Sequence, residues 1–131
     1  MPAPHQPIAS SDFSRLGEAW AFALPLLLPA IERAGTHWPA DVLDTLIEGR
    51  TQLWIGERSA LVTEIVVYPR LKACNIWLAG GDLEEVVEMQ RSVAEGARAR
   101  GCTRLELKGR PGWLRTESGI RSVGSYLVRD L

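Results

Sequence analysis

The sequence predicts an α+β domain with a mixed, mostly antiparallel sheet of five or six strands. Three observations predict this class: two helical patterns open the chain, three strand-like runs follow at residues 51–79, and a long amphipathic helix separates them from later strands. The 131 residues suit one compact domain. We expect an extended arm with three prolines at residues 1–10 and a single domain over residues 11–131.

The first half of the domain is predicted to begin with two helices. Ser11 and Asp12 are capping residues for a first helix that runs to about Arg33. A second, shorter helix follows from about Pro39 to Glu48. The most hydrophobic run, residues 19–31, is too short to span a bilayer, so we interpret it as a buried helix without a membrane role.

A three-stranded antiparallel meander is predicted next, with strands near Leu53–Ile55, Leu61–Tyr68 and Ala73–Ala79. The helix from Asp82 to Arg100 follows. The apolar side of this helix is expected to pack on the sheet through Leu83, Val86, Val87, Gln90, Val93, Ala94 and Ala97.

Beyond the long helix, residues 103–108 alternate between apolar and polar side chains, which predicts a strand with one buried face. Because a long helix joins it to the strand before, it is able to lie parallel to that strand. Residues 109–119 hold a turn and one short helix, and Ser122–Val128 supplies a last strand that includes Tyr126 as a partly buried residue.

Composition and charge describe an ordinary soluble protein. Cys74 and Cys102 are the only cysteines, and we expect both to be reduced core thiols in a cytoplasmic setting. Residues 1–97 carry 7 basic and 13 acidic side chains, a net charge of −6, whereas residues 98–131 carry 8 and 3, a net charge of +5. No nucleic-acid-binding motif accompanies the basic part, so we favour a mixed solvated surface over nucleic-acid binding.

The order of these elements resembles the fold of the GCN5-related N-acetyltransferases (GNAT) over roughly residues 11–131. The strings VTEIVVYP, IWLAGGD and ARARGCTRLELKGRPGW, with the closing Gly119, are similar to small GNAT-like proteins of tailed bacteriophages. The resemblance implies a location in the host cytoplasm or in a phage particle. It also implies that partners are other virion or assembly proteins, or further copies of the chain.

Acetyltransferases of the family bind the diphosphate of acetyl-CoA on backbone N–H groups between the fourth strand and the long helix, in a Q/R-x-x-G-x-G/A loop. The corresponding turn here, Ala79-Gly80-Gly81-Asp82, is short and has no basic residue. Asp82 as N-cap and Glu85 are expected to form a capping box, with Glu84 as a third acid, so carboxylates rather than phosphates meet the helix N-terminus. We therefore expect no cofactor; acetyl-CoA belongs to the alternative hypothesis.

The catalytic part of the family pattern is also altered. Where the family often has Y-x-x-x-G-F, with a tyrosine that protonates the leaving thiolate, this chain has Arg115 followed by Thr-Glu-Ser-Gly-Ile. Arginine is a poor proton donor at neutral pH. Glu64 on the central strand is a candidate general base through water, but an outward or hydrogen-bonded strand residue is the favoured interpretation. We assign no catalytic residue.

Other sites have little support in the sequence. His5 and His37 are the only histidines and lack metal-ligand spacing, and there is no G-x-S-x-G element of a hydrolase. Trp54 and Trp77 lie within predicted strands, where packing is the default.

The GRPGW turn differs, because Trp113 lies between Arg110 and Arg115, and turn-borne Trp and Arg anchor interfaces. The other interpretation of Trp113 is a lid over the core.

Two functional hypotheses follow. The first is a catalytically inactive GNAT-like protein that acts as a phage virion or assembly component through protein–protein contacts, with Arg110, Trp113 and Arg115 at the interface. The alternative is an acyl-CoA-dependent N-acetyltransferase with a divergent cofactor loop.

Overall fold

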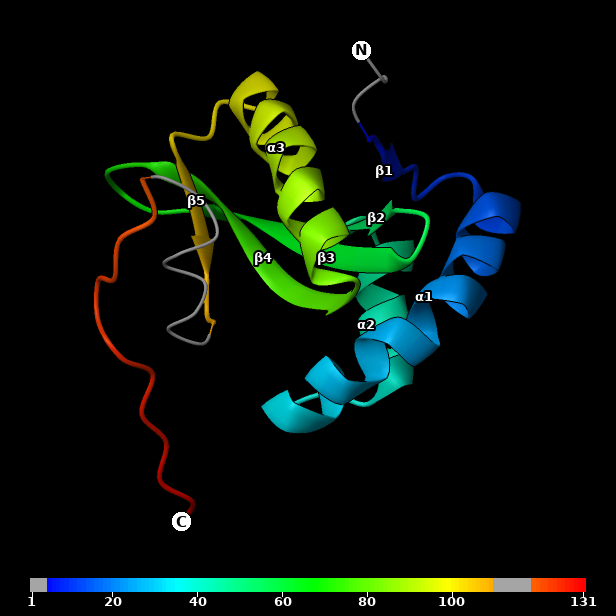
Figure 1. The fold of residues 1–131 in the computed structure, drawn as a ribbon, viewed down its shortest axis with the longest axis horizontal. Helices are drawn as coiled ribbons and strands as arrows, with labels where there is room; N and C mark the ends of the chain where they lie inside the picture. Colours follow the sequence, from blue (N-terminus) through cyan, green and yellow to red (C-terminus); the bar gives the residue numbers. More distant parts are fainter. Residues whose placement is uncertain (1–4, 110–118) are drawn as a thin grey trace.

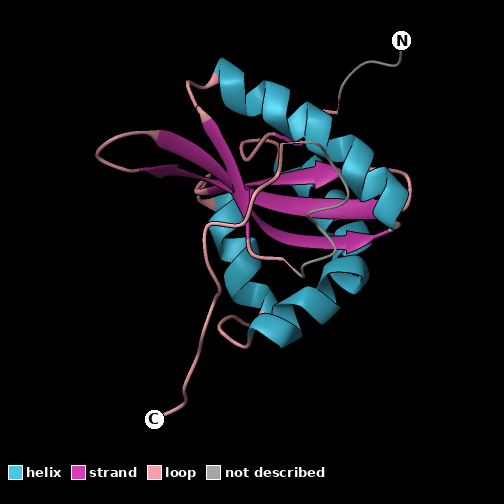
Figure 2. Cartoon of the chain, turned by 60° about the vertical axis from the view of Figure 1, so that its left-hand side comes forward, coloured by secondary structure: helices cyan, strands magenta, loops and turns pink. Residues whose placement is uncertain are grey.

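The computed structural model describes residues 5–109 and 119–131. In this part of the chain, five strands form one sheet in the order β1-β2-β3-β4-β5 (Figure 1). Helices α1 and α2 cover one face of the sheet, and α3 covers the other (Figure 2). The predicted α+β class and the mostly antiparallel sheet are confirmed.

The two N-terminal helices lie where the sequence predicts them. Helix α1 spans Phe13–Ala34, and the side chain of Asp12 caps it by accepting a hydrogen bond from the Arg15 N–H at 3.2 Å. Its buried side chains recur every three or four residues, as one helix face requires: Leu16, Trp20, Ala23, Leu27 and Ile31. Helix α2 spans Pro39–Ile47. No helix of the described residues is long and apolar enough to cross a membrane.

The predicted meander is confirmed as β2 (Thr51–Ile55), β3 (Ser59–Val67) and β4 (Lys72–Gly81), paired antiparallel in chain order. The register between β3 and β4 shifts by one residue, from Val62 opposite Leu78 to Thr63 opposite Ile76. Trp77 is therefore the extra residue of a β-bulge. It is half-buried on the side of α1 and meets the ring of His37 edge-on, with centroids 4.8 Å apart.

Helix α3 spans Leu83–Ala99 and connects β4 to β5 (Arg104–Leu107), which pairs parallel to β4 as predicted. The predicted packing face of α3 is partly wrong. Leu83 is 59% exposed, whereas Met89, which the prediction omitted, is completely buried together with Val93. Leu83 is the first residue of the helix and belongs to neither apolar core.

Part of the predicted N-terminal arm belongs to the sheet. Pro7–Ile8 form β1, a short edge strand that pairs antiparallel with β2, with Pro7 opposite Trp54. The backbone N–H of His5 donates to Ser92 Oγ of α3 at 2.9 Å. The domain itself therefore holds residues 5–8 in place.

The predicted last strand is wrong, because residues 122–128 form no strand in the structure. Tyr126, expected to be partly buried, is 67% exposed, and its ring lies 4.3 Å from Lys108 Nζ. The predicted turn and short helix of residues 109–119 fall almost entirely outside the described residues.

Two apolar cores lie on opposite faces of the sheet. Leu27, Val42 and Leu53 belong to the core under α1 and α2, and Leu61, Met89 and Val93 belong to the core under α3. Cys74 and Cys102 are buried free thiols in the second core, as predicted.

Candidate site at the start of helix α3

The two glycines at the end of β4 are required by close packing. A Cβ on Gly80 would fall on the backbone carbonyl of Leu26 in α1, and a Cβ on Gly81 would fall on that of Arg58. Gly81 also has φ +114°, which residues with a side chain rarely adopt. Their presence is thus explained by the contacts of β4 with α1 and with the start of β3, without any ligand.

Asp82 caps helix α3, but the predicted capping box is only half formed. Its Oδ2 accepts a hydrogen bond from the Glu85 N–H at 3.0 Å, as expected. In a full box the Glu85 side chain would bind the Asp82 N–H. That N–H instead donates to Ser59 Oγ at 3.0 Å. The first residue of β3 therefore takes the place of Glu85 at the cap.

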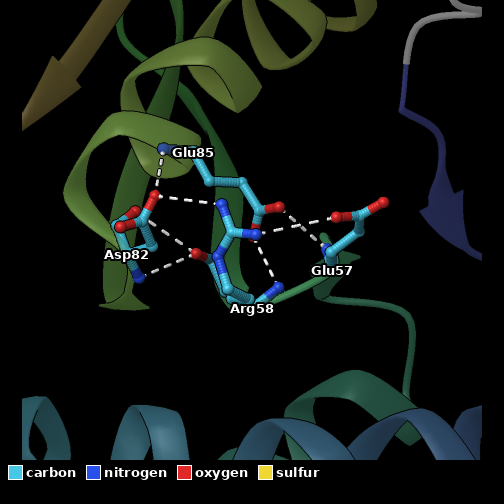
Figure 3. A network of polar contacts seen from close by, with 5 residues as sticks. Glu57, Arg58, Asp82 and Glu85 are labelled. Carbon is cyan, nitrogen blue, oxygen red and sulfur yellow. Dashed lines mark hydrogen bonds and ion pairs between the residues drawn. The ribbon is translucent and has the colours of Figure 1, made fainter.

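The Glu85 carboxylate binds the turn between β2 and β3 instead. Its two oxygens accept hydrogen bonds from the backbone N–H groups of Glu57, at 3.0 Å, and Arg58, at 2.7 Å (Figure 3). A carboxylate that accepts two backbone N–H groups is a strong, charge-assisted contact. Glu85 thus ties the first turn of α3 to a turn of the sheet that lies 27 and 28 residues earlier.

Among the described residues, Arg58 is the only cation of the network. The guanidinium lies 3.5 Å from Asp82 Oδ2 and 3.7 Å from Glu57 Oε2, and its side chain is 64% exposed. Exposed pairs of this length contribute little to stability. Four carboxylates, of Glu57, Asp82, Glu84 and Glu85, stand against this one guanidinium, so the start of α3 carries a net charge of −3.

The same contacts lower the pKa of the Glu85 carboxyl group. Partial burial raises the pKa, but the backbone N–H of Arg58, the hydroxyl of Ser59, the backbone N–H of Glu57 and the Arg58 charge outweigh it and hold the pKa below its ordinary value of 4.5. Glu85 is therefore ionised at neutral pH.

This arrangement does not fit a diphosphate such as that of acetyl-CoA. A helix N-terminus attracts phosphate through unpaired N–H groups and a positive potential. Here the N–H groups of Asp82 and Glu85 are already bonded within the protein, and three of the four carboxylates belong to the cap and first turn of α3. A diphosphate would meet repulsion from these carboxylates.

The other predicted candidates lie elsewhere. Glu64 on β3 accepts a hydrogen bond from Asn75 Nδ2 at 2.9 Å, which matches the favoured interpretation of a hydrogen-bonded strand residue. Arg110, Trp113 and Arg115, the predicted interface residues, lie outside the described residues. Within the described residues, no group of three or more His, Cys, Asp or Glu side chains is arranged to hold a metal ion.

Sequence reasoning missed Arg58, Ser59 and Glu57 as members of this site. They lie in and after the Gly56 turn, which is distant along the chain from Asp82. Only the pairing of Ser59 with Gly81 across β3 and β4 brings the two segments together.

No protein-family model matches the sequence, and a comparison with curated proteins finds no significant match. Solved structures with the same fold do exist. An aminoglycoside acetyltransferase from an uncultured soil metagenomic sample aligns with 100% of this chain and 99% of its own, at 10% identity and a TM-score of 0.67. A ribosomal-protein-alanine N-acetyltransferase from Brucella melitensis biovar Abortus 2308 aligns with 88% of this chain and 94% of its own, at 14% identity and a TM-score of 0.63.

An acetyltransferase from Trypanosoma brucei aligns with 97% of this chain and 98% of its own, at 16% identity and a TM-score of 0.60. At these identities the likeness concerns the fold. The chain has a GNAT-like fold, and these three structural neighbours are described as acetyltransferases.

Proposed function

We propose that this chain is a GNAT-fold protein that does not bind acyl-CoA and acts by binding another protein. The single observation that carries the proposal is the closed network at the start of α3. Glu85 there binds the backbone N–H groups of Glu57 and Arg58, and Asp82 caps the helix. These carboxylates stand where a diphosphate would need donors and positive charge.

Close backbone packing explains the glycines without a cofactor. Gly80 and Gly81 are needed for the approach of Leu26 and Arg58, so a strand, glycines and a helix in sequence do not by themselves indicate a nucleotide-like ligand. The acidic first turn is a stabilising feature of α3, because negative charge near a helix N-terminus contributes about 0.3–1 kcal/mol per residue.

For the partner contact we propose Arg110, Trp113 and Arg115. The residue types support this, since Trp contributes large rigid contact area and Arg forms two-pronged hydrogen bonds with carboxylates. The resemblance to small phage proteins supports a virion or assembly protein as the partner, in the host cytoplasm or in the particle. The excess negative charge of residues 1–97 and positive charge of residues 98–131 also permit contact between copies.

A second candidate is an N-acetyltransferase with a divergent cofactor loop. The observation in its favour is that acetyltransferase structures align with nearly the whole chain. In that case acetyl-CoA would have to bind despite the carboxylates of the cap and first turn of α3.

Thermal unfolding distinguishes the two candidates. A ligand present at 100 times its dissociation constant stabilises the folded state by about 2.7 kcal/mol, which corresponds to a rise in Tm of roughly 8 °C for a domain of this size. We expect no rise with acetyl-CoA in excess. The Brucella N-acetyltransferase, handled in parallel, serves as the positive control. A saturable rise for this chain would favour the acetyltransferase.

A further inference from the structure

A cavity of about 170 Å³ lies between the sheet and the C-terminal half of α3. Trp54 of β2, Thr63 of β3 and Val93 of α3 form part of its wall, and Arg100 stands at the end of that helix. The start of α3 is roughly 15 Å away along the helix axis, so the cavity is separate from the network around Glu85.

Small residues on α3 create this space. Gly96, Ala97 and Ala99 all line the cavity. The ring of Trp54 lies beneath Gly96, where an added Cβ would stand 3.1 Å from Trp54 Cη2. A larger side chain at Gly96 would therefore press on the indole, and its absence lets the ring form a flat apolar wall.

The N-terminal arm closes one side of the cavity. Gln6 and Pro7 contribute to the lining, Pro7 pairs with Trp54 across β1 and β2, and the His5 N–H reaches Ser92 of α3. The arm thus bridges from the edge of the sheet to the helix. This gives residues 5–8 a structural role that their sequence did not suggest.

The polar groups of the cavity form a directed chain of hydrogen bonds. Trp54 Nε1–H donates to Thr63 Oγ1 at 2.9 Å, and the Thr63 hydroxyl donates to Gln52 Oε1 at 2.8 Å. The Gln52 amide oxygen is thereby engaged. Its NH₂ group has no hydrogen bond to any described residue, so it remains a donor at the cavity.

Charge in the lining is positive. Among the described residues, Arg100 is the only charged one that lines the cavity, and it forms no ion pair with another of them. Cys74 also lines it, but burial raises the pKa of its thiol to about 11, so it adds no negative charge at neutral pH. An apolar chamber with one amide donor and one guanidinium suits an anion with an apolar body.

We propose that this cavity binds a small monocarboxylate with a ring-sized apolar body, which lies against Trp54 and Val93 while its carboxylate meets Arg100 and the Gln52 amide. The volume is adequate, because a cavity of about 150 Å³ in another protein accommodates benzene. Guanidinium and carboxylate form the strongest hydrogen-bonded pairs available to such a ligand.

Benzoate is a suitable probe, followed by the indole N–H signal of Trp54 in NMR spectra. For so small a ligand we expect a dissociation constant on the order of 1 mM. Benzyl alcohol, which has the ring without the charge, should bind about tenfold more weakly to the wild type, because the Arg100 contact is lost. The Gln52 side-chain amide signals should shift together with that of Trp54.

The matched variants are Arg100→Gln and Arg98→Gln, which remove the same charge from the same end of α3. Both arginines are exposed, but only Arg100 lines the cavity. Arg100→Gln should weaken benzoate about tenfold without changing the affinity for benzyl alcohol. Arg98→Gln should change neither affinity. Both variants should lower Tm to a similar small extent, because each removes one positive charge from the C-terminal end of α3. No saturable shift of the Trp54 signal, or equal effects of the two variants on benzoate affinity, would overturn the proposal.

Discussion

The carboxylate of Glu85, in the first turn of α3, accepts a hydrogen bond of 2.7 Å from the backbone N–H of Arg58, at the start of β3. This contact joins the long helix to the sheet at the position where acetyltransferases of the same fold are expected to hold a phosphate. The first turn of α3 thus carries an anion of the chain itself, and this anion is bound to the turn between β2 and β3.

Replacement of Glu85 by Gln should destabilise the protein at neutral pH by about 1 kcal/mol, because one charged acceptor of two backbone N–H groups is lost. The folded pKa of Glu85 lies below its ordinary value of 4.5. Its contribution is therefore complete above about pH 4.5 and is lost as the pH falls through the folded pKa. Urea unfolding of both proteins at pH 7 and near pH 3 measures this. A wild-type advantage that grew on acidification would contradict the assignment.

Gly80→Ala should lower the free energy of unfolding by about 2 kcal/mol or more, because the new methyl group overlaps the Leu26 carbonyl and forces α1 away from β4. Gly17→Ala is the control, since Gly17 lies in α1 with open space around it and should gain roughly 0.5–1 kcal/mol from helix propensity. Chemical denaturation gives both values. Equal effects would show that α1 does not press on Gly80.

Met89→Ala should lower the free energy of unfolding by about 3 kcal/mol, because Met89 is completely buried in the core under α3. Leu83→Ala should change stability by less than about 0.5 kcal/mol, because Leu83 is 59% exposed. The comparison of the two midpoints in urea tests the face of α3 directly. A larger loss of stability for Leu83→Ala than for Met89→Ala would instead support the packing face predicted from the sequence.

These residues show which parts of the structure could be predicted from the sequence and which could not. Helix ends, the meander and the parallel strand β5 follow local patterns, so they were predictable. The helical spacing of apolar residues is compatible with burial of either Leu83 or Met89. Only the position of the sheet beneath α3 determines that Met89 is the buried residue. The strand pattern of residues 122–128 meets no pairing strand among the described residues. The contacts of Glu85 with Glu57 and Arg58 join segments distant in sequence, which no local pattern reports.

Trp113→Ala should weaken binding of the partner protein by about 2 kcal/mol or more if Trp113 anchors the interface. Trp38→Ala is the matched control, since Trp38 is 78% exposed and lies at the start of α2. Particle incorporation or pull-down gives the binding, and circular dichroism checks the fold. Normal binding by the Trp113 variant would remove this residue from the interface, and a lost fold would identify it as a core residue.

The measurement that tests the central claim most directly is calorimetric titration of the protein with acetyl-CoA at low salt, beside a variant in which Asp82, Glu84 and Glu85 are replaced by Ser, Gln and Gln. We expect no measurable binding to the wild type, because the carboxylates at the start of α3 repel a diphosphate there. The variant should remain inactive as an acetyltransferase. A low-micromolar dissociation constant for the wild type, on the order of 10 μM or below, would contradict the account.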